Sequence, residues 1–226
     1  MQNFVNIAVC AIVLMSVSQI SSFNIYQNSH NKKFQWDNIP KVEVSAYYEV
    51  LCPDSIRFVR NELQTTYSKL SSIMNFHLIP YGKASSFAKS EGGYEFNCQH
   101  GQEECFGNMV HACSNKYVQS KSVLLDFVAC MIKDNRDAIK IGKSCAKEYS
   151  VDWQPIERCA HSIEGENLLY EEGEKTHNLS PRLRFVPTVE LDKSQSNQRS
   201  LLHDLAIQVC KHYTGPLPSV CTELNH

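Results

Sequence analysis

Apolar and polar residues alternate early in the chain in a way that predicts a β-strand. Between residues 41 and 51 an apolar side chain stands at every second position, the period of a half-buried strand. These residues are Val42, Val44, Ala46, Tyr48 and Val50. So clean an alternation favours a strand with one face less covered than the other. Helical spacing follows from Pro53 to about Ser72, and residues 75–81 predict a second strand. Strand, helix and strand predict a right-handed βαβ unit.

The pattern changes after residue 82. Residues 83–101 are polar, and Gly92-Gly93 predicts a turn. From residue 104 to about 177, apolar stripes at helical spacing predict a series of short helices. A strand pattern returns from Arg184 to Leu191, and a helix is predicted from Leu201 to Tyr213. We therefore predict an α/β fold with a frame of residues 41–82 and 178–214. A disulfide-braced helical lobe of residues 83–177 is inserted into it, and residues 215–226 form a tail.

The start of the chain predicts the compartment. Residues 1–22 carry no charged side chain, and the apolar run from Val5 to Met15 is shorter than the roughly 20 residues that cross a bilayer. This favours a secretory signal peptide over residues 1–22, cleaved after Ser18 or Ser22, with a buried strand or helix as the alternative. Residues 23–40 lack periodicity and predict a leader or propiece. No later apolar run is long enough for a membrane span.

Composition and cysteine count narrow the class of protein. The chain has 226 residues, is 42% hydrophobic and carries a net charge of −2 without a basic stripe, so nucleic acid is not an expected partner. Removing Cys10 with the signal leaves nine of the ten cysteines, an odd number. In an oxidising compartment this predicts one thiol outside the bridges. The candidates for structural disulfides are Cys98, Cys105, Cys113, Cys130, Cys145, Cys159, Cys210 and Cys221. Eight half-cystines allow 105 pairings, so none is predicted.

Cys52 stands where the first predicted strand ends and the first predicted helix begins. Pro53 suits a first helical turn, where its missing N–H costs nothing. A cysteine at this place faces unpaired N–H groups and the positive end of the helix dipole, which favour the thiolate. Asp54 opposes the thiolate by charge repulsion, whereas the Ser55 hydroxyl could donate a hydrogen bond to it. We interpret Cys52 as a nucleophile. A buried free thiol without a role, or a bridged Cys52, is the alternative.

The segment from residue 98 to residue 113 carries a specific motif. Its fixed residues are Cys98, Gln99, His100, Gly101, Glu104, Cys105, Asn108 and Cys113, spaced as CQHGxxECxxNxxxxC. At every fixed position the segment resembles the signature of the γ-interferon-inducible lysosomal thiol reductase (GILT) family, and the likeness covers essentially the whole mature chain. The resemblance implies a thioredoxin-like fold with a helical insertion. It also implies a secretory or lysosomal location and the reduction of protein disulfides through a CxxC pair.

Two positions matter for the activity that this resemblance implies. In a thiol-exchange fold, the proline of a step such as Val186-Pro187 is cis and lies against the reactive sulfur. We therefore predict a substrate-facing loop at Val186 and Pro187. Ser55, however, replaces the second cysteine of the pair, and a serine cannot release a mixed disulfide.

The replacement at Ser55 leaves two functions open. If Cys52 attacks, release needs an outside thiol such as free cysteine or glutathione, or a second thiol of the substrate. We expect a monothiol reductase or isomerase acting on disulfide-containing proteins, without a bound cofactor. A redox-impaired, secreted binding protein is the alternative.

Other chemistries find less support in the sequence. The cysteines of the signature, with His100 and His111, could be written as zinc ligands, but they lack tight CxxC spacing, so bridges are favoured and no metal is expected. His100 and Asn108 are expected to fix the local backbone. Ser55 lies in no GxSxG motif, which argues against a hydrolase. Asn178 begins a glycosylation sequon weakened by Pro181, so both lysosomal delivery and secretion stay open.

Overall fold

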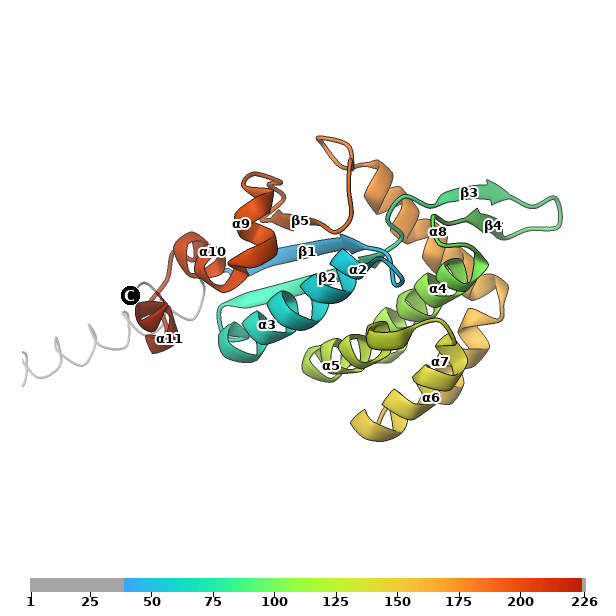
Figure 1. The fold of residues 1–226 in the computed structure, drawn as a ribbon, viewed down its shortest axis with the longest axis horizontal. Helices are drawn as coiled ribbons and strands as arrows, with labels where there is room; N and C mark the ends of the chain where they lie inside the picture. Colours follow the sequence, from blue (N-terminus) through green and yellow to red (C-terminus); the bar gives the residue numbers. More distant parts are fainter. Residues whose placement is uncertain (1–38, 225–226) are drawn as a thin grey trace, which may run out of the picture. The chain divides into compact units, whose positions relative to one another are not determined.

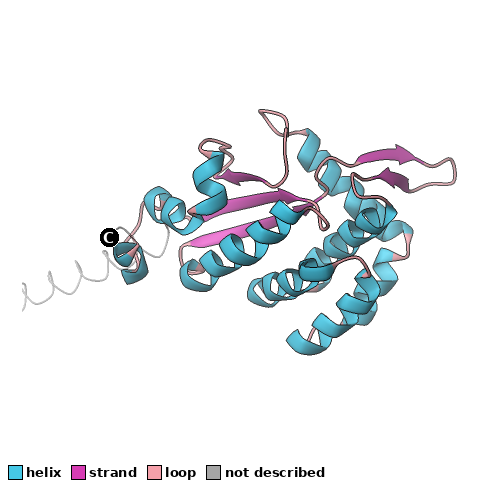
Figure 2. Ribbon diagram, viewed as in Figure 1, coloured by secondary structure: helices cyan, strands magenta, loops and turns pink. Residues whose placement is uncertain are grey.

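A computed structural model of the chain describes residues 39–224. The predicted signal peptide and nearly all of the predicted propiece therefore lie outside the described residues. Residues 41–213, with the segment that follows residue 216, form one compact unit, whose elements are labelled in Figure 1 and coloured by type in Figure 2.

The strands are β1 (Val42–Tyr48), β2 (Met74–Pro80), β3 (Ser85–Ala88), β4 (Tyr94–Asn97) and β5 (Thr188–Leu191). The helices before the lobe are α2 (Pro53–Arg57), the π-helical η1 (Phe58–Leu63) and α3 (Gln64–Leu70). The lobe contains α4 (Gln102–Tyr117), α5 (Lys121–Met131), the 3-10 turn η2 (Ile132–Asp134), α6 (Ala138–Tyr149), α7 (Trp153–Ala160) and α8 (Ile163–His177). The last helices are α9 (Gln198–His203), α10 (Leu205–His212) and α11 (Ser219–Glu223).

The central sheet has three strands in the order β2-β1-β5. β1 pairs with β2 in parallel, from Val42 opposite Met74 to Tyr48 opposite Pro80, and with β5 in antiparallel fashion. All five alternating apolar residues of the predicted first strand are 3% exposed or less. Glu43 and Ser45, which alternate with them, are partly exposed. The alternation therefore correctly predicted a strand with one more accessible face.

The first helical segment runs without a break from Pro53 to Leu70 through α2, η1 and α3. Its buried side is apolar and includes Phe58, Val59 and Leu63. Together with β1 and β2 it forms the predicted strand, helix and strand. The end of β1, the central strand, therefore meets the start of α2. This places Cys52 between the C-terminal end of that strand and a helix N-terminus.

The helical lobe is drawn from green to orange in Figure 1, beside the sheet. Within it, α4 contacts both α7 and α8, and α5 contacts α6. The lobe also covers the free edge of β2, because Asn115 Nδ2 donates to the Leu78 carbonyl at 2.8 Å and Lys121 Nζ to the Phe76 carbonyl at 3.0 Å. At the opposite edge, the side-chain amide of Gln198 binds both the N–H and the carbonyl of Val189. Side chains thus form hydrogen bonds with main-chain groups on both edges of the sheet.

Three predictions of local structure were wrong in detail. Residues 83–101 contain the β3–β4 hairpin rather than only a turn. The strand predicted from Arg184 begins at Thr188, because Pro187 lacks an N–H and the Phe185 carbonyl accepts from Thr188 Oγ1 instead. The helix predicted from residue 201 to residue 213 is divided into α9 and α10 at Asp204, whose φ of −137° is not helical.

Candidate active site

Cys52 lies in the loop between β1 and α2, where it is the N-cap residue of the helix. Cys52 is 9% exposed. Its Sγ lies 3.8 Å from the carbonyl oxygen of Val186, to which the thiol donates. The backbone N–H of Cys52 donates to the Glu49 carbonyl at 3.4 Å. The sulfur is therefore placed between the start of a helix and the loop that precedes β5.

Cys52 is the free cysteine of the described residues. The structure pairs the other eight as Cys98–Cys105, Cys113–Cys159, Cys130–Cys145 and Cys210–Cys221. The first three lie in the helical lobe, and the fourth joins α10 to α11. Because Cys98, Cys105 and Cys113 are half-cystines, they offer no thiolate to a zinc ion.

Ser55 is completely buried in the first turn of α2. Its Oγ accepts a hydrogen bond from the backbone N–H of Glu49 at 3.3 Å. Among the described residues it makes no hydrogen bond to the Cys52 sulfur, so the expected donation to the sulfur is not present. The serine instead holds the start of the loop that carries Cys52.

Two signature residues on α4 hold the rest of this loop. Asn108 Oδ1 accepts from the Val50 N–H at 3.1 Å, and Glu104 Oε2 accepts from the Leu51 N–H at 3.4 Å. Three successive backbone N–H groups, of residues 49, 50 and 51, therefore donate to side chains rather than to a strand. This explains why β1 ends at Tyr48, before the predicted Leu51, and it ties the position of Cys52 to the signature.

The carboxylate of Glu104 is itself held by His100. The backbone N–H of His100 donates to Glu104 Oε1 at 3.1 Å, and His100 Nδ1 lies 2.6 Å from Glu104 Oε2. Gly101, with a φ of +86°, precedes the first residue of α4, a conformation that glycine adopts without strain. The Cys98–Cys105 bridge encloses these residues. The segment from residue 98 to residue 105 thus folds back on itself and presents Glu104 to the Cys52 loop.

Glu49 extends the same network on its other side. Its side chain is 1% exposed, and its Oε1 accepts from the Lys83 N–H at 2.7 Å. With the Gln99 amide oriented to donate, its nitrogen lies 3.2 Å from both carboxylate oxygens of Glu49. Burial raises the pKa of Glu49, the Lys83 N–H opposes this rise, and nearby Glu104 adds to it. Glu49 therefore has an increased tendency to carry a proton.

Glu49, His100 and Glu104 form a group that could hold a metal ion, since each offers one ligand atom and these atoms lie within 4.8 Å of one another. His100 Nδ1 is 3.7 Å from Glu49 Oε2 and 2.6 Å from Glu104 Oε2. These contacts satisfy the ligand atoms internally. We therefore interpret the group as a clamp of hydrogen bonds and ion pairs that supports the Cys52 loop.

The predicted substrate-facing loop lies against Cys52. The Val186-Pro187 peptide bond is cis. A cavity of about 330 Å³ opens beside the loop, between α2 and the end of α9, and Phe58, Val186, Pro187 and Leu202 supply apolar parts of its lining. Phe185, also part of this lining, is 42% exposed. The arrangement offers an apolar surface next to the sulfur.

Asp54 and Arg57 form an ion pair of 2.6 Å at the mouth of the site, with side chains 61% and 59% exposed. Both residues also line the cavity beside the predicted loop. The expected repulsion between Asp54 and a Cys52 thiolate is therefore partly balanced by the guanidinium of Arg57.

A second buried group lies deeper, on α4. The Nδ1 atom of His111 is 2.9 Å from the Tyr48 hydroxyl, whereas its Nε2 has no hydrogen-bond partner among the described residues. Burial lowers the pKa of His111 to about 3. His111 is thus a neutral side chain of the interior at physiological pH rather than a ligand in the site.

The structure brings together Cys52, Ser55, Val186 and the signature residues from Gln99 to Asn108. It leaves Asn178 elsewhere, as the exposed C-cap of α8. Sequence reasoning missed Glu49, which forms part of the clamp, and Lys83, whose N–H binds it. The available signal was the position of Glu49, the one charged residue between Val44 and Asp54. A charged residue next to a buried strand end needs partners in the fold.

A free cysteine before a helix, facing an X-Pro loop on a small mixed sheet, defines a thioredoxin-fold thiol–disulfide oxidoreductase site. Among solved structures, a putative protein disulfide isomerase from Nitrosomonas europaea has a TM-score of 0.51 and 10% identity. The match covers 76% of this chain and 99% of that one and shows a shared fold.

Sequence comparison gives the family. The model described as gamma interferon inducible lysosomal thiol reductase (GILT) matches residues 43–149. A GILT-like protein of Anopheles gambiae is 36% identical over 200 residues, 81% of each chain. The reductase of Carassius auratus is 35% identical over 188 residues, 81% of this chain and 73% of that one. The chain belongs to the GILT family, and its family and fold support thiol–disulfide exchange as the general reaction type.

Proposed function

We propose that this chain is a monothiol member of the GILT family, in which Cys52 attacks disulfides of protein substrates and an external thiol completes the reaction. The observation that carries the proposal is the pair of side chains at the start of α2. The free sulfur of Cys52 faces Val186, whereas the second position of the family motif holds Ser55, buried and bonded to the Glu49 N–H.

The proposed reaction begins when the Cys52 thiolate attacks one sulfur of a substrate disulfide. A bond forms between Cys52 and that sulfur, the substrate S–S bond breaks, and the other substrate sulfur leaves as a thiolate that takes a proton. An external thiolate then attacks Cys52 Sγ in the mixed disulfide and releases the second substrate sulfur as a thiolate, and a second external thiolate attacks the resulting disulfide and frees Cys52. Ser55 takes no part in exchange. Where a second thiol of the substrate makes the second attack, the outcome is isomerisation.

The signature clamp gives Cys52 its position in this proposal. The N–H groups of residues 49–51 are already bound to side chains, so the loop that carries the sulfur is fixed before a substrate arrives. A fixed nucleophile spends less binding free energy on ordering. The carbonyl of Val186 accepts from the thiol and so lies within reach of an incoming substrate chain. The fixed loop that carries Cys52 and the backbone of Val186 that faces it are the two features that support exchange at this sulfur.

We propose the secretory pathway as the location, with lysosomal delivery and secretion as the two destinations. The names of the relatives from Carassius auratus and Mus musculus describe lysosomal thiol reductases. Four bridges in the described residues fit an oxidising compartment. In residues 39–224, no helix has the length and apolarity required to cross a membrane. Asn178, exposed after α8, is the candidate for glycosylation.

The test is reduction of insulin disulfides by the mature protein with and without glutathione. We expect turnover that requires the added thiol and is lost in Cys52→Ser. The variant Ser55→Cys is expected to complete one round of reduction without added thiol, because its second sulfur releases the mixed disulfide, whereas continued turnover still needs the thiol to reduce the bridge that forms. Turnover that persists in Cys52→Ser would contradict the proposal.

One observation favours the second candidate, a redox-impaired binding protein. Cys52 is 9% exposed, and its sulfur lies 3.8 Å from the Val186 carbonyl oxygen, so the sulfur is covered. If that candidate holds, neither wild type nor Ser55→Cys reduces insulin at any thiol concentration. The purified protein would still unfold cooperatively with all four bridges intact.

A further inference from the structure

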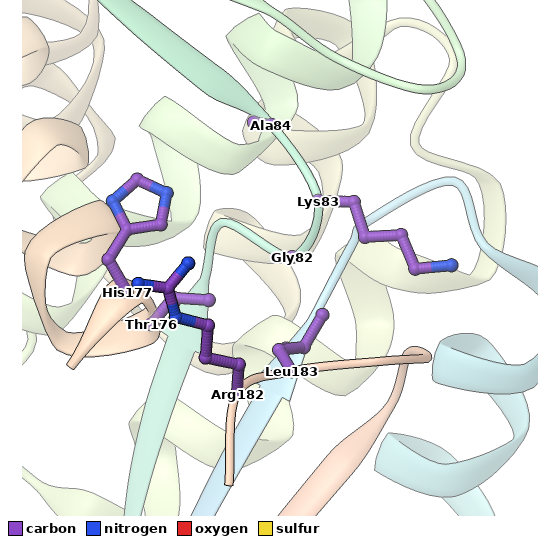
Figure 3. A pocket seen from close by; sticks show the side chains of 7 residues that line it. All are labelled: Gly82, Lys83, Ala84, Thr176, His177, Arg182 and Leu183. Carbon is purple, nitrogen blue, oxygen red and sulfur yellow. The ribbon is translucent and has the colours of Figure 1, made fainter. Parts of the chain in front are cut away.

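A basic pocket lies close to the proposed site, and its side chains form none of the hydrogen bonds of the clamp. It has a volume of about 410 Å³, within the range of small-molecule sites. Figure 3 shows the Arg182 and His177 side chains on one side of it and Lys83 reaching out on the other. None of the residues that line it is acidic. The pocket therefore favours an anionic ligand of small-molecule size.

Two of its cations have no ion-pair partner in the described part of the chain. The side chains of Lys83 and Arg182 are exposed and enter no ion pair or hydrogen bond there. His177, by contrast, lies 4.0 Å from Glu174. Unpaired guanidinium and ammonium groups at a concave surface are suited to carboxylate oxygens, which the guanidinium can bind in a bidentate manner.

The pocket is joined to the Cys52 site by direct contacts. The Lys83 N–H donates to Glu49 at 2.7 Å, and Glu49 is three residues from Cys52. On the other wall, Leu183 is three residues from Val186, whose carbonyl is 3.8 Å from the sulfur. Three residues span at most about 11 Å. The wall of the pocket at Leu183 therefore lies within about 11 Å of Val186, the residue that faces the sulfur.

We propose that this pocket binds the carboxylates of the low-molecular-weight thiol that completes the reaction at Cys52, a thiol of the glutathione type. The inference rests on the proposed function, because Ser55 cannot resolve the mixed disulfide. A peptide thiol with terminal carboxylates matches the charge of the pocket and extends further than a single amino acid. Free cysteine shares the carboxylate chemistry but is shorter. An acidic segment of a protein substrate would not need a cavity of this size.

The step that the pocket serves is balanced as follows. The bound thiolate attacks Cys52 Sγ in the mixed disulfide, and the bond to the substrate breaks. The substrate leaves as a thiolate and takes a proton from water, while Cys52 is left bonded to the external thiol. A second external thiolate attacks that bond, frees Cys52 and leaves with the first as their disulfide. Two thiols are oxidised, and one substrate disulfide is reduced.

The kinetic test uses Lys83→Ala combined with Arg182→Ala in the mature protein. Only side chains are removed, so the Lys83 N–H bond to Glu49 remains. We expect the KM for glutathione in insulin reduction to rise at least tenfold with kcat nearly unchanged. The KM for cysteamine, a thiol without a carboxylate, should change less than twofold. The control, Lys133→Ala with Arg136→Ala, removes two exposed cations of the helical lobe and should leave both KM values unchanged.

Three kinetic results would overturn the inference. These are an unchanged glutathione KM, an equal rise for cysteamine, and a rise in the KM for insulin with the thiol KM constant, which would assign the pocket to the protein substrate. Free cysteine is a further arm. A rise in its KM equal to that of glutathione supports carboxylate binding by the pocket, with the shorter thiol as the ligand.

A binding measurement separates this inference from the proposed function. S-methylglutathione, which cannot exchange, is titrated into Cys52→Ser by calorimetry. We expect binding that weakens at least tenfold when the two pocket cations are removed. Absence of binding overturns the inference that the pocket binds a thiol of the glutathione type. If binding is present but no thiol, cysteamine included, supports Cys52-dependent turnover, then the proposed function fails and the ligand site stands by itself.

Discussion

The helical lobe and the central sheet are stabilised in different ways. Three disulfides cross the lobe between α4 and α7, between α5 and α6, and at the start of α4. No disulfide joins the strands β1, β2 and β5 within the described residues; they are held by their ladder and by apolar packing. Cys52, the free sulfur, belongs to the sheet region. The strands next to Cys52 thus keep their shape without a disulfide of their own, whereas the segment that holds the Cys52 loop is closed by the Cys98–Cys105 bridge.

The buried face of α4 indicates why the lobe needs its bridges. That face contains four buried polar residues, Glu104, Asn108, His111 and Ser114. A fifth, Asn135, lies outside α4 and packs against Gly107 of this helix. Both polar side-chain atoms of Asn135 and His111 Nε2 lack a hydrogen-bond partner in the described part of the chain. Buried polar atoms reduce the free energy gained on folding. The bridges offset this by restricting the unfolded chain.

The largest expected effect comes from removing the bridge with the longest loop. Cys113 and Cys159 are separated by 46 residues, so replacing both by Ala should lower the free energy of unfolding by about 4 kcal/mol. Cys52→Ala should lower it by less than about 1 kcal/mol, because it breaks no bridge. Urea denaturation followed by circular dichroism measures both. Equal losses would remove the distinction between lobe and sheet.

We expect the carboxylate of Glu104, in the helical lobe, to control the position of the loop that carries Cys52. Glu104→Gln replaces an acceptor oxygen by a donor where the N–H of Leu51 and the ring of His100 donate. We expect a loss of about 2 kcal/mol in unfolding free energy and an altered rate of Cys52 alkylation by iodoacetamide. Glu103→Gln is the matched control, because it removes the same charge from the same turn at an exposed position. Similar behaviour of the two variants would argue against the clamp.

Acid is expected to weaken the lobe through His111. Its pKa is about 3 in the folded protein and about 6.5 when the side chain is exposed in the unfolded chain, so the unfolded chain binds the proton more tightly. This contribution to stability is present above pH 6.5 and is lost as the pH falls towards 3. The loss between pH 7 and pH 5 is about 2 kcal/mol. Unfolding measured at both pH values should show a smaller decrease in His111→Gln than in wild type.

Buried carboxylates act in the opposite direction. Burial raises the pKa values of Glu49 and Glu172, so the folded protein holds these protons more tightly and gains stability as the pH falls. For that reason the His111 prediction concerns the difference between variant and wild type, not the total change. A His111→Gln curve parallel to that of wild type would contradict it.

The smallest effect is expected at the exposed ion pair beside the site. Asp54→Asn removes the ion pair with Arg57, a contact of 2.6 Å. The side chains of both residues are more than half exposed. Pairs of this kind contribute little, so the free energy of unfolding should change by less than about 0.5 kcal/mol. The alkylation rate of Cys52 should rise, because a negative charge near the thiolate is removed. A decrease in that rate would show that Asp54 supports the sulfur by another route.

The sequence predicted the parts of the fold that depend on local periodicity. The alternation from Val42 to Val50 and the helical spacing after Pro53 correspond to β1 and to the continuous helix of α2, η1 and α3. Positions where side chains replace the backbone ladder were not predictable. Strand β1 stops at Tyr48 because the next three N–H groups donate to side chains, the first to Ser55 and the other two to Asn108 and Glu104, more than 50 residues later. No local pattern carries that information.

The candidate site shows the same division. Cys52 and the signature residues were found from spacing, and their resemblance to a family gave the reaction type. The contact between the signature and the Cys52 loop came only from the three-dimensional structure, as did the part played by Glu49. Ser55 was expected to act on the sulfur and instead binds the Glu49 N–H. A hydroxyl has several partners within reach, and the sequence does not rank them.

The covered edges of the sheet have a consequence for association with other chains. Asn115 and Lys121 occupy carbonyls of β2, and Gln198 occupies both main-chain groups of Val189 in β5. An extended polypeptide cannot add to either border at these points, and two copies cannot join border to border there. Both borders of the sheet are thereby protected at these points against strand addition and edge-to-edge aggregation.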